Sequence, residues 1–180
     1  AYEITYGDWS SDVCSSDLVA CGKHFPGHGD TSKDSHKELP VVGAPLEVLR
    51  ERELVPFHYA ILNGLTTIMT AHVVYPSLDA QRPATLSPAI LTGLLREQLG
   101  FEGVIVSDDL EMHAIADHHG VGEAAVQAIL AGADLLLVCK DRNKAVAAMD
   151  AVHAAVENGT IAQDRLEASV DRKSTRLNSS

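Results

Sequence analysis

Residues 103–112 read GVIVSDDLEM, a short apolar run that ends directly in two aspartates. The run is apolar without alternation, which is typical of a strand covered on both faces in a parallel sheet. Comparable apolar runs give expected strands at residues 18–21, 65–70, 103–107 and 133–138. A segment with helical spacing follows each run, and repeated strand–helix units of this kind predict an α/β fold with a parallel sheet.

The expected helices carry start and stop signals. Ser87 and Pro88 give an N-cap followed by a first-turn proline, and Gly100 ends the apolar face of the same helix. Together the expected helices cover residues 46–62, 87–99, 122–130 and 143–156. Four strand–helix units amount to half of an eight-unit barrel, which normally needs ~250 residues. Polar residues directly after the strands favour the C-terminal half of a TIM-type (β/α)8 barrel, and a small doubly wound sheet is the competing architecture.

The two ends of the chain show neither the apolar spacing of a strand nor that of an amphipathic helix. Residues 1–18 are crowded with Ser and Asp, and residues 173–180 are similarly patternless. Both segments look non-native, like translated cloning or adapter sequence, and we expect them to lie outside the domain. The partial catalytic barrel is therefore placed at residues 19–172.

Composition excludes several classes of function. The chain has 180 residues and a formal net charge of −11, with 46% hydrophobic and 22% charged residues, as in an ordinary single globular domain. The acidic balance argues against a nucleic acid or an anionic membrane as partner, and the scattered basic residues, Arg142 and Arg165 among them, are expected as solvated surface. No apolar run reaches the roughly 18 residues of a membrane-spanning helix. Three scattered cysteines predict neither a disulfide framework nor a zinc knuckle, and no signal peptide is visible.

The segment at residues 23–36, KHFPGHGDTSKDSH, concentrates titratable groups. Its proline and glycines exclude a helix, so His24 and His28 are not a helical metal-binding pair. A loop of this kind after a barrel strand is a natural place for a general acid or base. A metal site is the rival interpretation, with His24, His28, Asp30 and His72 as ligands around an activated water.

Asp108 directly follows a buried strand, where an ionised carboxylate is costly unless donors surround it. Such positions often hold a nucleophile, a base or a metal ligand. For Asp109 a structural role as a helix N-cap is favoured. His72 is expected as a hydrogen-bonded residue of the barrel rim rather than a pocket residue. His118 and His119 are expected in an exposed loop, and Cys139 is expected to pack rather than react.

The segments KHFPGHGDTSKDSH, AHVVYP, RPATLS and LREQLGFEGVIVSDDLEM together closely resemble the β-N-acetylhexosaminidase branch of the family 3 glycoside hydrolases. The resemblance runs over residues 19–171. It implies a retaining, exo-acting enzyme that removes terminal β-linked N-acetylglucosamine, from peptidoglycan fragments in cell-wall recycling. It also implies no cofactor or metal, a cytoplasmic location, and a monomer when the protein is full length.

The resemblance also assigns roles to individual residues. Asp108 matches the catalytic nucleophile, His36 the proton donor and Asp34 its dyad partner, while Lys23 and His24 match residues that hold the N-acetylglucosamine unit. In a retaining mechanism one carboxylate attacks the anomeric carbon while a second group protonates the departing oxygen. Histidine suits the second role because it titrates near neutral pH without special burial, and a neighbouring carboxylate orients its ring. A lysine near the nucleophile would help to keep it ionised.

Two alternatives stay open beside this interpretation. One is the metal-dependent hydrolase built on the His-rich loop. The other is a catalytically incompetent fragment with exposed strand edges, because the family's sugar-binding Asp and Arg lie upstream of the loop motif and have no match in this chain. Hydrolysis and phosphorolysis are both compatible with a histidine acid/base.

Overall fold

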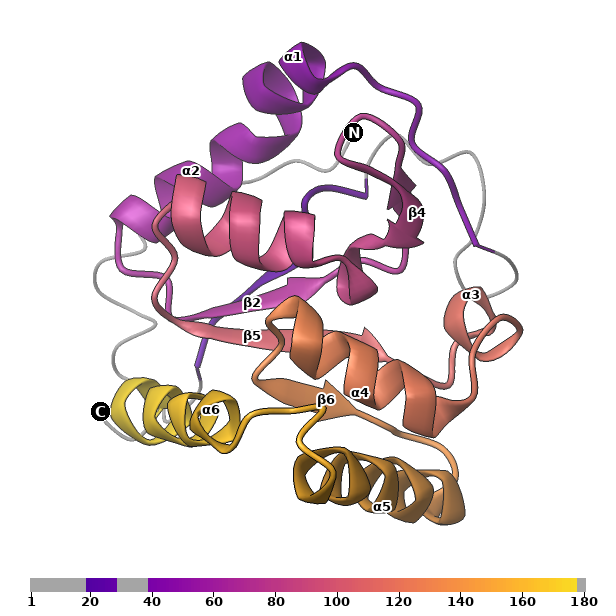
Figure 1. The fold of residues 1–180 in the computed structure, drawn as a ribbon. Helices are drawn as coiled ribbons and strands as arrows, with labels where there is room; N and C mark the ends of the chain where they lie inside the picture. Colours follow the sequence, from indigo (N-terminus) through magenta and orange to yellow (C-terminus); the bar gives the residue numbers. More distant parts are fainter. Residues whose placement is uncertain (1–18, 29–38, 178–180) are drawn as a thin grey trace.

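The computed structural model describes residues 19–28 and 39–177 and contains a four-stranded sheet packed against helices (Figure 1). The strands lie side by side in the order β1 (Cys21–Phe25), β2 (Thr67–Thr70), β5 (Val104–Asp109) and β6 (Leu135–Leu137), with parallel pairing. Because the strand order follows the chain order, each crossover moves in the same direction, and right-handed connections then place the crossover helices on one face. This order is that of a barrel arc, whereas a doubly wound sheet reverses its order at a switch point. The predicted half barrel is confirmed.

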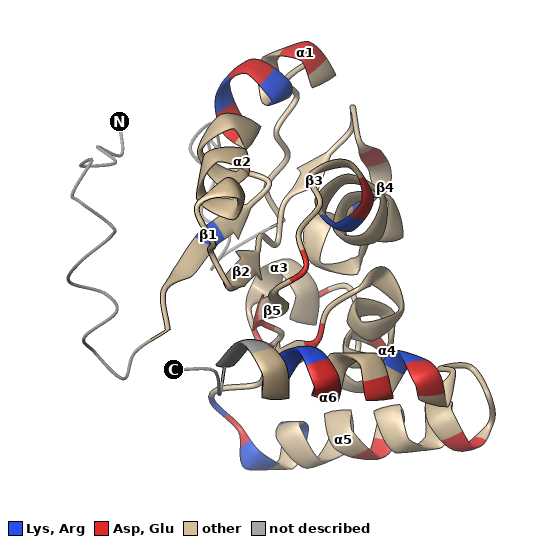
Figure 2. Cartoon of the chain, turned by 90° about the vertical axis from the view of Figure 1, so that its left-hand side faces the viewer, with Lys and Arg blue, Asp and Glu red and all other residues tan. Residues whose placement is uncertain are grey.

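Helices fill the connections between the strands. They are α1 (Leu46–Val48), η2 (Leu49–Glu53) and α2 (Leu54–Leu62) in one continuous stretch, then η3 (Ala84–Leu86), η4 (Ala89–Gln98), α3 (His113–Ala116), α4 (Val121–Ala131), α5 (Arg142–Glu157) and α6 (Gln163–Leu177). A short antiparallel hairpin, β3 (Val74–Tyr75) with β4 (Asp79–Pro83), follows β2. Charged residues are concentrated on outer helices such as α5 and α6, and the strands carry few (Figure 2). Among the described residues, no helix has the length and apolar character needed to cross a bilayer.

Apolar side chains of the central strands anchor the core. Ile68 on β2 and Ile105 on β5 are paired in register, and both are fully buried. The backbones approach closely at the start of β5, where a Cβ on Gly103 would lie 2.3 Å from the carbonyl oxygen of Thr66. Glycine therefore permits this strand pairing. The expected cap of the next crossover is present, because Ser87 Oγ accepts a hydrogen bond from the backbone N–H of Ile90 at 3.3 Å.

Three expected boundaries differ in the structure. β5 covers Val104–Asp109, two residues beyond the expected end at residue 107, so Asp108 belongs to the strand and does not follow it. The first strand was predicted at residues 18–21, but β1 covers Cys21–Phe25, so the titratable residues Lys23 and His24 belong to the strand itself. β2 pairs with Gly22 before them and with Phe25 after them, across an irregularity in the register, and such tertiary pairing outweighs local composition. At the other end, α6 continues to Leu177 and crosses the boundary drawn at residue 172. The foreign origin of residues 1–18 and 173–180 stays a prediction.

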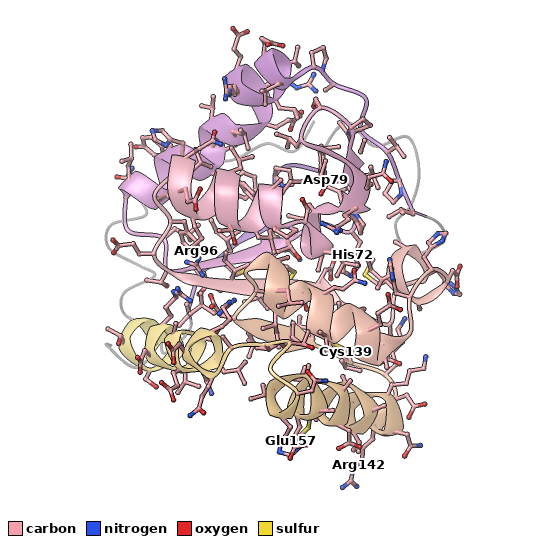
Figure 3. All side chains as sticks on the ribbon, viewed as in Figure 1. His72, Asp79, Arg96, Cys139, Arg142 and Glu157 are labelled. Atoms are coloured by element: carbon pink, nitrogen blue, oxygen red, sulfur yellow. The ribbon has the colours of Figure 1, made fainter. Side chains whose placement is uncertain are left out.

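A buried carboxylate at the start of β6 collects three guanidinium groups. Asp134, whose side chain is fully buried, forms ion pairs with Arg96, Arg165 and Arg172. The prediction that Arg165 is solvated surface is wrong, because it also donates to the carbonyl of Ala133 at 2.7 Å. Burial lowers the pKa of Arg96 to about 10, against the opposing influence of Asp134. This cluster, called the Asp134 cluster below, fastens α6 and η4 to the amino end of the sheet (Arg96 is labelled in Figure 3).

Candidate active site

The carboxyl end of β5 presents Asp108 at the edge where parallel strands of a barrel meet. The Asp108 side chain is 19% exposed. Its Oδ1 accepts a hydrogen bond from the backbone N–H of Asp109 at 2.8 Å, so this oxygen is held by the chain itself. Its Oδ2 is directed across β2 toward His24 on β1, the next strand but one in the sheet.

His24 is the described residue that meets Asp108 from β1. Its Nε2 lies 3.6 Å from Asp108 Oδ2, an ion-pair distance when the imidazole is protonated and longer than a hydrogen bond. The ring of His28 lies edge-on to the ring of His24, with 5.7 Å between centroids. Lys23 precedes His24 on β1 with its side chain exposed, and no ion pair between Lys23 and Asp108 occurs in the described part of the chain. Two of the predicted site residues, His24 and Asp108, therefore lie within 3.6 Å of each other, and their roles stay predictions.

His72 is buried behind the site and fully hydrogen-bonded. Its Nδ1 lies 2.8 Å from Thr85 Oγ1, and its Nε2 lies 3.0 Å from the carbonyl oxygen of Asp109. Burial lowers its pKa, while the backbone bond to Asp109 and the charge of Asp108 oppose that change. The prediction of a hydrogen-bonded rim histidine is confirmed, and Figure 3 shows His72 near the carboxyl end of the sheet, away from Arg96.

Asp109 and Glu111 join the end of β5 to the segment after β6. Asp109 Oδ1 accepts from the backbone N–H groups of Glu111 at 3.1 Å and Cys139 at 3.3 Å. A structural role for Asp109 is therefore confirmed, but it closes a turn and does not cap a helix. Glu111 accepts from the N–H groups of Lys140 at 2.6 Å and Asp141 at 3.1 Å, just before α5, and these bonds, led by that of Lys140, lower its pKa. Sequence reasoning missed this contact of Glu111.

Other expected candidates lie at the periphery. Cys139 is exposed, so the expectation that it packs is wrong; the strand ends two residues earlier and its side chain faces solvent. Desolvation first, and the nearby Asp109 carboxylate second, raise the pKa of its thiol, which disfavours the reactive thiolate. His118 is exposed as predicted, and His119 lies 3.5 Å from Glu123 at the start of α4.

The metal interpretation loses one of its ligands. Both ring nitrogens of His72 already have partners, so neither directs a lone pair toward a common centre with His24 and His28. Within residues 19–28 and 39–177, no three His, Cys, Asp or Glu side chains are grouped for metal binding. Asp30, Asp34 and His36 lie outside the described residues.

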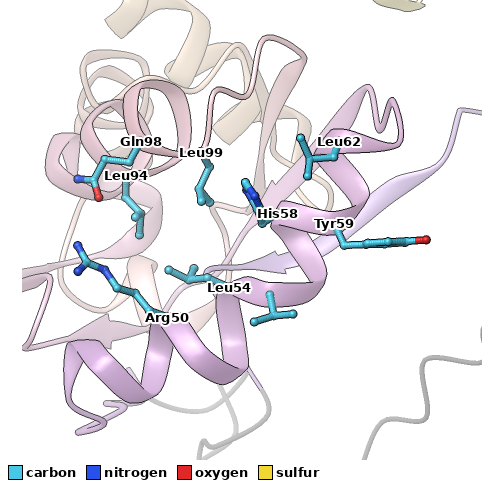
Figure 4. A pocket seen from close by; sticks show the side chains of 9 residues that line it. Arg50, Leu54, His58, Tyr59, Leu62, Leu94, Gln98 and Leu99 are labelled. Atoms are coloured by element: carbon cyan, nitrogen blue, oxygen red, sulfur yellow. The ribbon is translucent and has the colours of Figure 1, made fainter.

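A cavity of about 490 Å³ is lined by residues of α2 and η4 (Figure 4). Leu62 near the end of α2 and Leu99 after η4 are among its lining residues. Each precedes the next strand by only a few residues, so the cavity lies toward the amino ends of the strands. Barrel enzymes place their chemistry at the opposite, carboxyl ends. This apolar hollow is therefore not the candidate active site.

The chain matches glycoside hydrolases over most of its length. Residues 10–175 match the family model described as the glycosyl hydrolase family 3 N terminal domain. A curated protein of Thiobacillus denitrificans (strain ATCC 25259 / T1) named beta-hexosaminidase is 47% identical over 122 residues, which cover 68% of this chain and 34% of that protein. The chain thus spans about a third of the length of this curated relative.

Solved structures give the same result. A glycoside hydrolase family 3 beta-N-acetylglucosaminidase from Paenibacillus sp. str. FPU-7 superposes with a TM-score of 0.89 at 48% identity, covering 92% of this chain and 32% of that one. The beta-N-acetylglucosaminidase from Thermotoga maritima superposes with a TM-score of 0.83 at 37% identity, covering 91% of this chain and 35% of that one. These similarities extend over nearly the whole described part of the chain.

Proposed function

The chain belongs to glycosyl hydrolase family 3, and on that premise we propose that the protein is a retaining exo-β-N-acetylglucosaminidase that acts on peptidoglycan-derived fragments. The observation that carries the proposal is the position of Asp108, a part-buried carboxylate at the carboxyl end of a barrel strand, 3.6 Å from His24. The names of the similar proteins, beta-hexosaminidase and beta-N-acetylglucosaminidase, support the substrate class.

Asp108 acts as the nucleophile in this proposal. Because Oδ1 is held by the Asp109 N–H, Oδ2 is the oxygen that attacks the anomeric carbon. The product is a glycosyl ester on Asp108, and the departing oxygen takes a proton from His36, which Asp34 orients. Water then attacks the anomeric carbon while His36 takes its proton, and the bond to Asp108 Oδ2 breaks, which releases the sugar and restores the carboxylate. His24, next to Oδ2, binds a hydroxyl of the sugar, and Lys23 on the same strand adds a second contact.

The chain supplies an arc of the barrel, which decides how the proposal is tested. Among the described residues, β1 and β6 are the outer strands of the sheet, and each has one strand neighbour. The assay is therefore run on the chain itself and on a chimera in which residues 19–172 replace the matching segment of the full-length Thiobacillus relative. If only the chimera is active, the chain alone is the catalytically incompetent fragment of the second alternative.

The test is release of a chromogenic phenol from an aryl β-N-acetylglucosaminide, with and without a chelator. We expect chelator-insensitive turnover, and Asp108→Asn is expected to lower kcat by about 10⁴-fold or more, because the amide has no negative charge to attack with. Asp117→Asn is the matched control, since its side chain is 54% exposed and pairs with His113 on the surface. Turnover that survives in the Asp108 variant would refute the nucleophile assignment, and turnover that a chelator abolishes would favour the metal-dependent hydrolase.

A further inference from the structure

Hydrogen bonds connect the backbone on both sides of Asp108 through three buried side chains, Thr70, Thr85 and His72. The N–H of Asp108 lies 3.4 Å from Thr70 Oγ1, which lies 2.8 Å from Thr85 Oγ1. Thr85 Oγ1 in turn lies 2.8 Å from His72 Nδ1. His72 Nε2 completes the connection at 3.0 Å from the carbonyl oxygen of Asp109. Thr70, Thr85 and His72, called the Thr–Thr–His network below, are at most 1% exposed.

The direction of each hydrogen bond follows from the acceptor at the end. A carbonyl oxygen only accepts, so His72 Nε2 carries the proton that it donates to Asp109. A neutral imidazole then has an accepting Nδ1, which requires the Thr85 hydroxyl to donate to it. Burial, which lowers the pKa of His72, favours this neutral form. The Thr85 hydroxyl has a second acceptor within reach, the carbonyl of Ala71 at 3.1 Å. That carbonyl already accepts from the backbone N–H of Thr85 at 3.3 Å, so we assign the single hydroxyl proton to the nearer acceptor, His72 Nδ1 at 2.8 Å.

The remaining bonds are fixed by the same reasoning. Since the Thr85 proton points to His72, the Thr70 hydroxyl donates to Thr85 and accepts from the N–H of Asp108. The network replaces backbone pairing at the place where β2 diverges from β5. Beyond Thr70, the N–H of Ala71 bonds to Phe25 on β1 instead. A threonine hydroxyl therefore holds the Asp108 amide where no strand backbone continues.

We propose that the Thr–Thr–His network is a positioning device that fixes the direction in which Asp108 presents Oδ2 to substrate. The inference rests on the proposed function, because it assumes that Asp108 is the nucleophile. One end of the network holds the N–H of Asp108 and the other holds the carbonyl of Asp109, so the backbone that carries the nucleophile is clamped on both sides. The same backbone donates to Oδ1, so clamping it also sets the orientation of the carboxylate.

A second threonine on β2 separates positioning from ordinary burial. Thr67 lies at the other end of the strand and is 7% exposed. Its Oγ1 is buried without a hydrogen-bond partner among the described residues. The strand therefore accommodates a buried threonine whose hydroxyl makes no hydrogen bond to the described residues. Thr67→Val is a matched control, because it removes such a hydroxyl.

The kinetic test compares Thr85→Val, Thr70→Val, Thr85→Ser and Thr67→Val in the active chimera. Aryl β-N-acetylglucosaminides with good and poor leaving groups serve as substrates. We expect Thr85→Val and Thr70→Val to lower kcat about 10–100-fold with little change in KM, since a misplaced nucleophile slows the chemical step. The loss of kcat should be equal for every leaving group, because the variants affect the attack of Asp108 and leave protonation of the departing oxygen unchanged. Thr85→Ser restores the hydroxyl and should recover most of the rate, and Thr67→Val should match the wild type.

Three outcomes would overturn the inference. One is a Thr85→Val enzyme that behaves as Thr67→Val does. Another is a loss that grows with poorer leaving groups, because this pattern reports on the proton donor. The third is a loss of kcat that disappears when the assay temperature is below the unfolding temperature of the variant. This result would mean that Thr85 contributes only to stability.

A readout without turnover distinguishes failure of this inference from failure of the proposed function. Nitrogen-15 shifts of the His72 ring report the protonated Nε2 and the accepting Nδ1, and hydrogen exchange reports the protection of the Asp108 amide. Thr85→Val should change the Nδ1 shift and speed exchange at Asp108, and Thr67→Val should change neither. If the wild-type chimera hydrolyses no aryl β-N-acetylglucosaminide, the function fails. If it does, but Thr85→Val leaves the His72 and Asp108 signals unchanged, the network fails.

Discussion

The two ends of the parallel sheet each hold a carboxylate, and the two carboxylates differ in burial and in the number of donors that contact them. At the amino end, Asp134 is fully buried and its two oxygens accept from Arg96, Arg165 and Arg172, from Ser169 Oγ and from the N–H of Ile105. At the carboxyl end, Asp108 is 19% exposed, with Oδ1 bonded to the next N–H and Oδ2 at 3.6 Å from His24.

The difference separates a carboxylate used for stability from one suited to chemistry. Donors saturate both oxygens of Asp134, so it has no lone pair directed to a ligand and its charge is compensated several times over. Asp108 is oriented through its backbone, while Oδ2 stays directed toward His24 on β1. Partial burial of the Asp108 carboxylate costs free energy, and proteins tolerate such a cost at functional sites. At Asp108 it leaves Oδ2 within reach of a reacting atom.

The largest expected effect comes from comparing one variant at each end of the sheet. Asp134→Ala leaves three guanidinium groups without their common carboxylate, so we expect a loss of about 3–5 kcal/mol in the free energy of unfolding. Asp108→Asn should change that free energy by less than about 1 kcal/mol, because the amide oxygen still accepts from Asp109. Urea unfolding followed by circular dichroism measures both. Equal destabilisation by the two variants would remove the distinction between the ends.

A smaller effect is expected inside the Asp134 cluster. Arg165→Met removes contacts to Asp134, Ser169 and the carbonyl of Ala133, and should destabilise the protein by about 1–3 kcal/mol, in the range of hydrogen bonds to charged groups. Arg142→Met is the matched control, because Arg142 is exposed at the start of α5 and points away from the body of the molecule in Figure 3. It should change the stability by less than about 0.5 kcal/mol. Similar losses from both arginines would mean that the cluster adds nothing beyond a surface charge.

The contrast between these arginines also explains what the sequence could and could not reveal about the fold. Apolar runs identified β2, β5 and β6, because strands buried on both faces leave that pattern. The pattern missed α6, since much of its attachment comes from polar groups: Arg165, Ser169 and Arg172 all reach Asp134. A buried aspartate at the start of an apolar run is the signal that could have predicted basic partners elsewhere in the chain.

The site was predictable to a different extent. Asp108 was singled out as a carboxylate at the end of a strand and His24 as part of a segment rich in titratable groups, and the structure places the two side chains 3.6 Å apart. Their roles in catalysis and sugar binding stay predictions. Thr70 and Thr85 were not singled out, because an isolated threonine on a strand or before a helix has no distinctive spacing. Thr70 and Thr85 form a hydrogen bond only because the fold places the end of β2 beside the segment after β4. The roles of Asp34 and His36 stay predictions.

The smallest expected effect tests the neutral imidazole at the carboxyl end through acid stability. Burial holds the pKa of folded His72 below its ordinary value of 6.5, so below that pH the unfolded chain binds a proton that the folded chain does not. The stabilising contribution of neutral His72 is therefore fully present above pH 6.5 and is lost as the pH falls. The slope is at most about 1.4 kcal/mol per pH unit.

His72→Gln should remove this part of the slope, because the amide offers both a donor and an acceptor and does not titrate. Urea unfolding between pH 7 and pH 5 measures the difference between the variant and the wild type. His113→Gln is the control, since His113 is 63% exposed and pairs with Asp117 at the surface, and it should keep the part of the slope that comes from His72. An unchanged slope in His72→Gln would mean that folding does not lower the pKa of His72. A wild type that loses stability relative to His72→Gln as the pH rises would mean that His72 is protonated when folded. Nδ1 would then donate to Thr85, and the hydrogen-bond directions assigned to the network would be overturned.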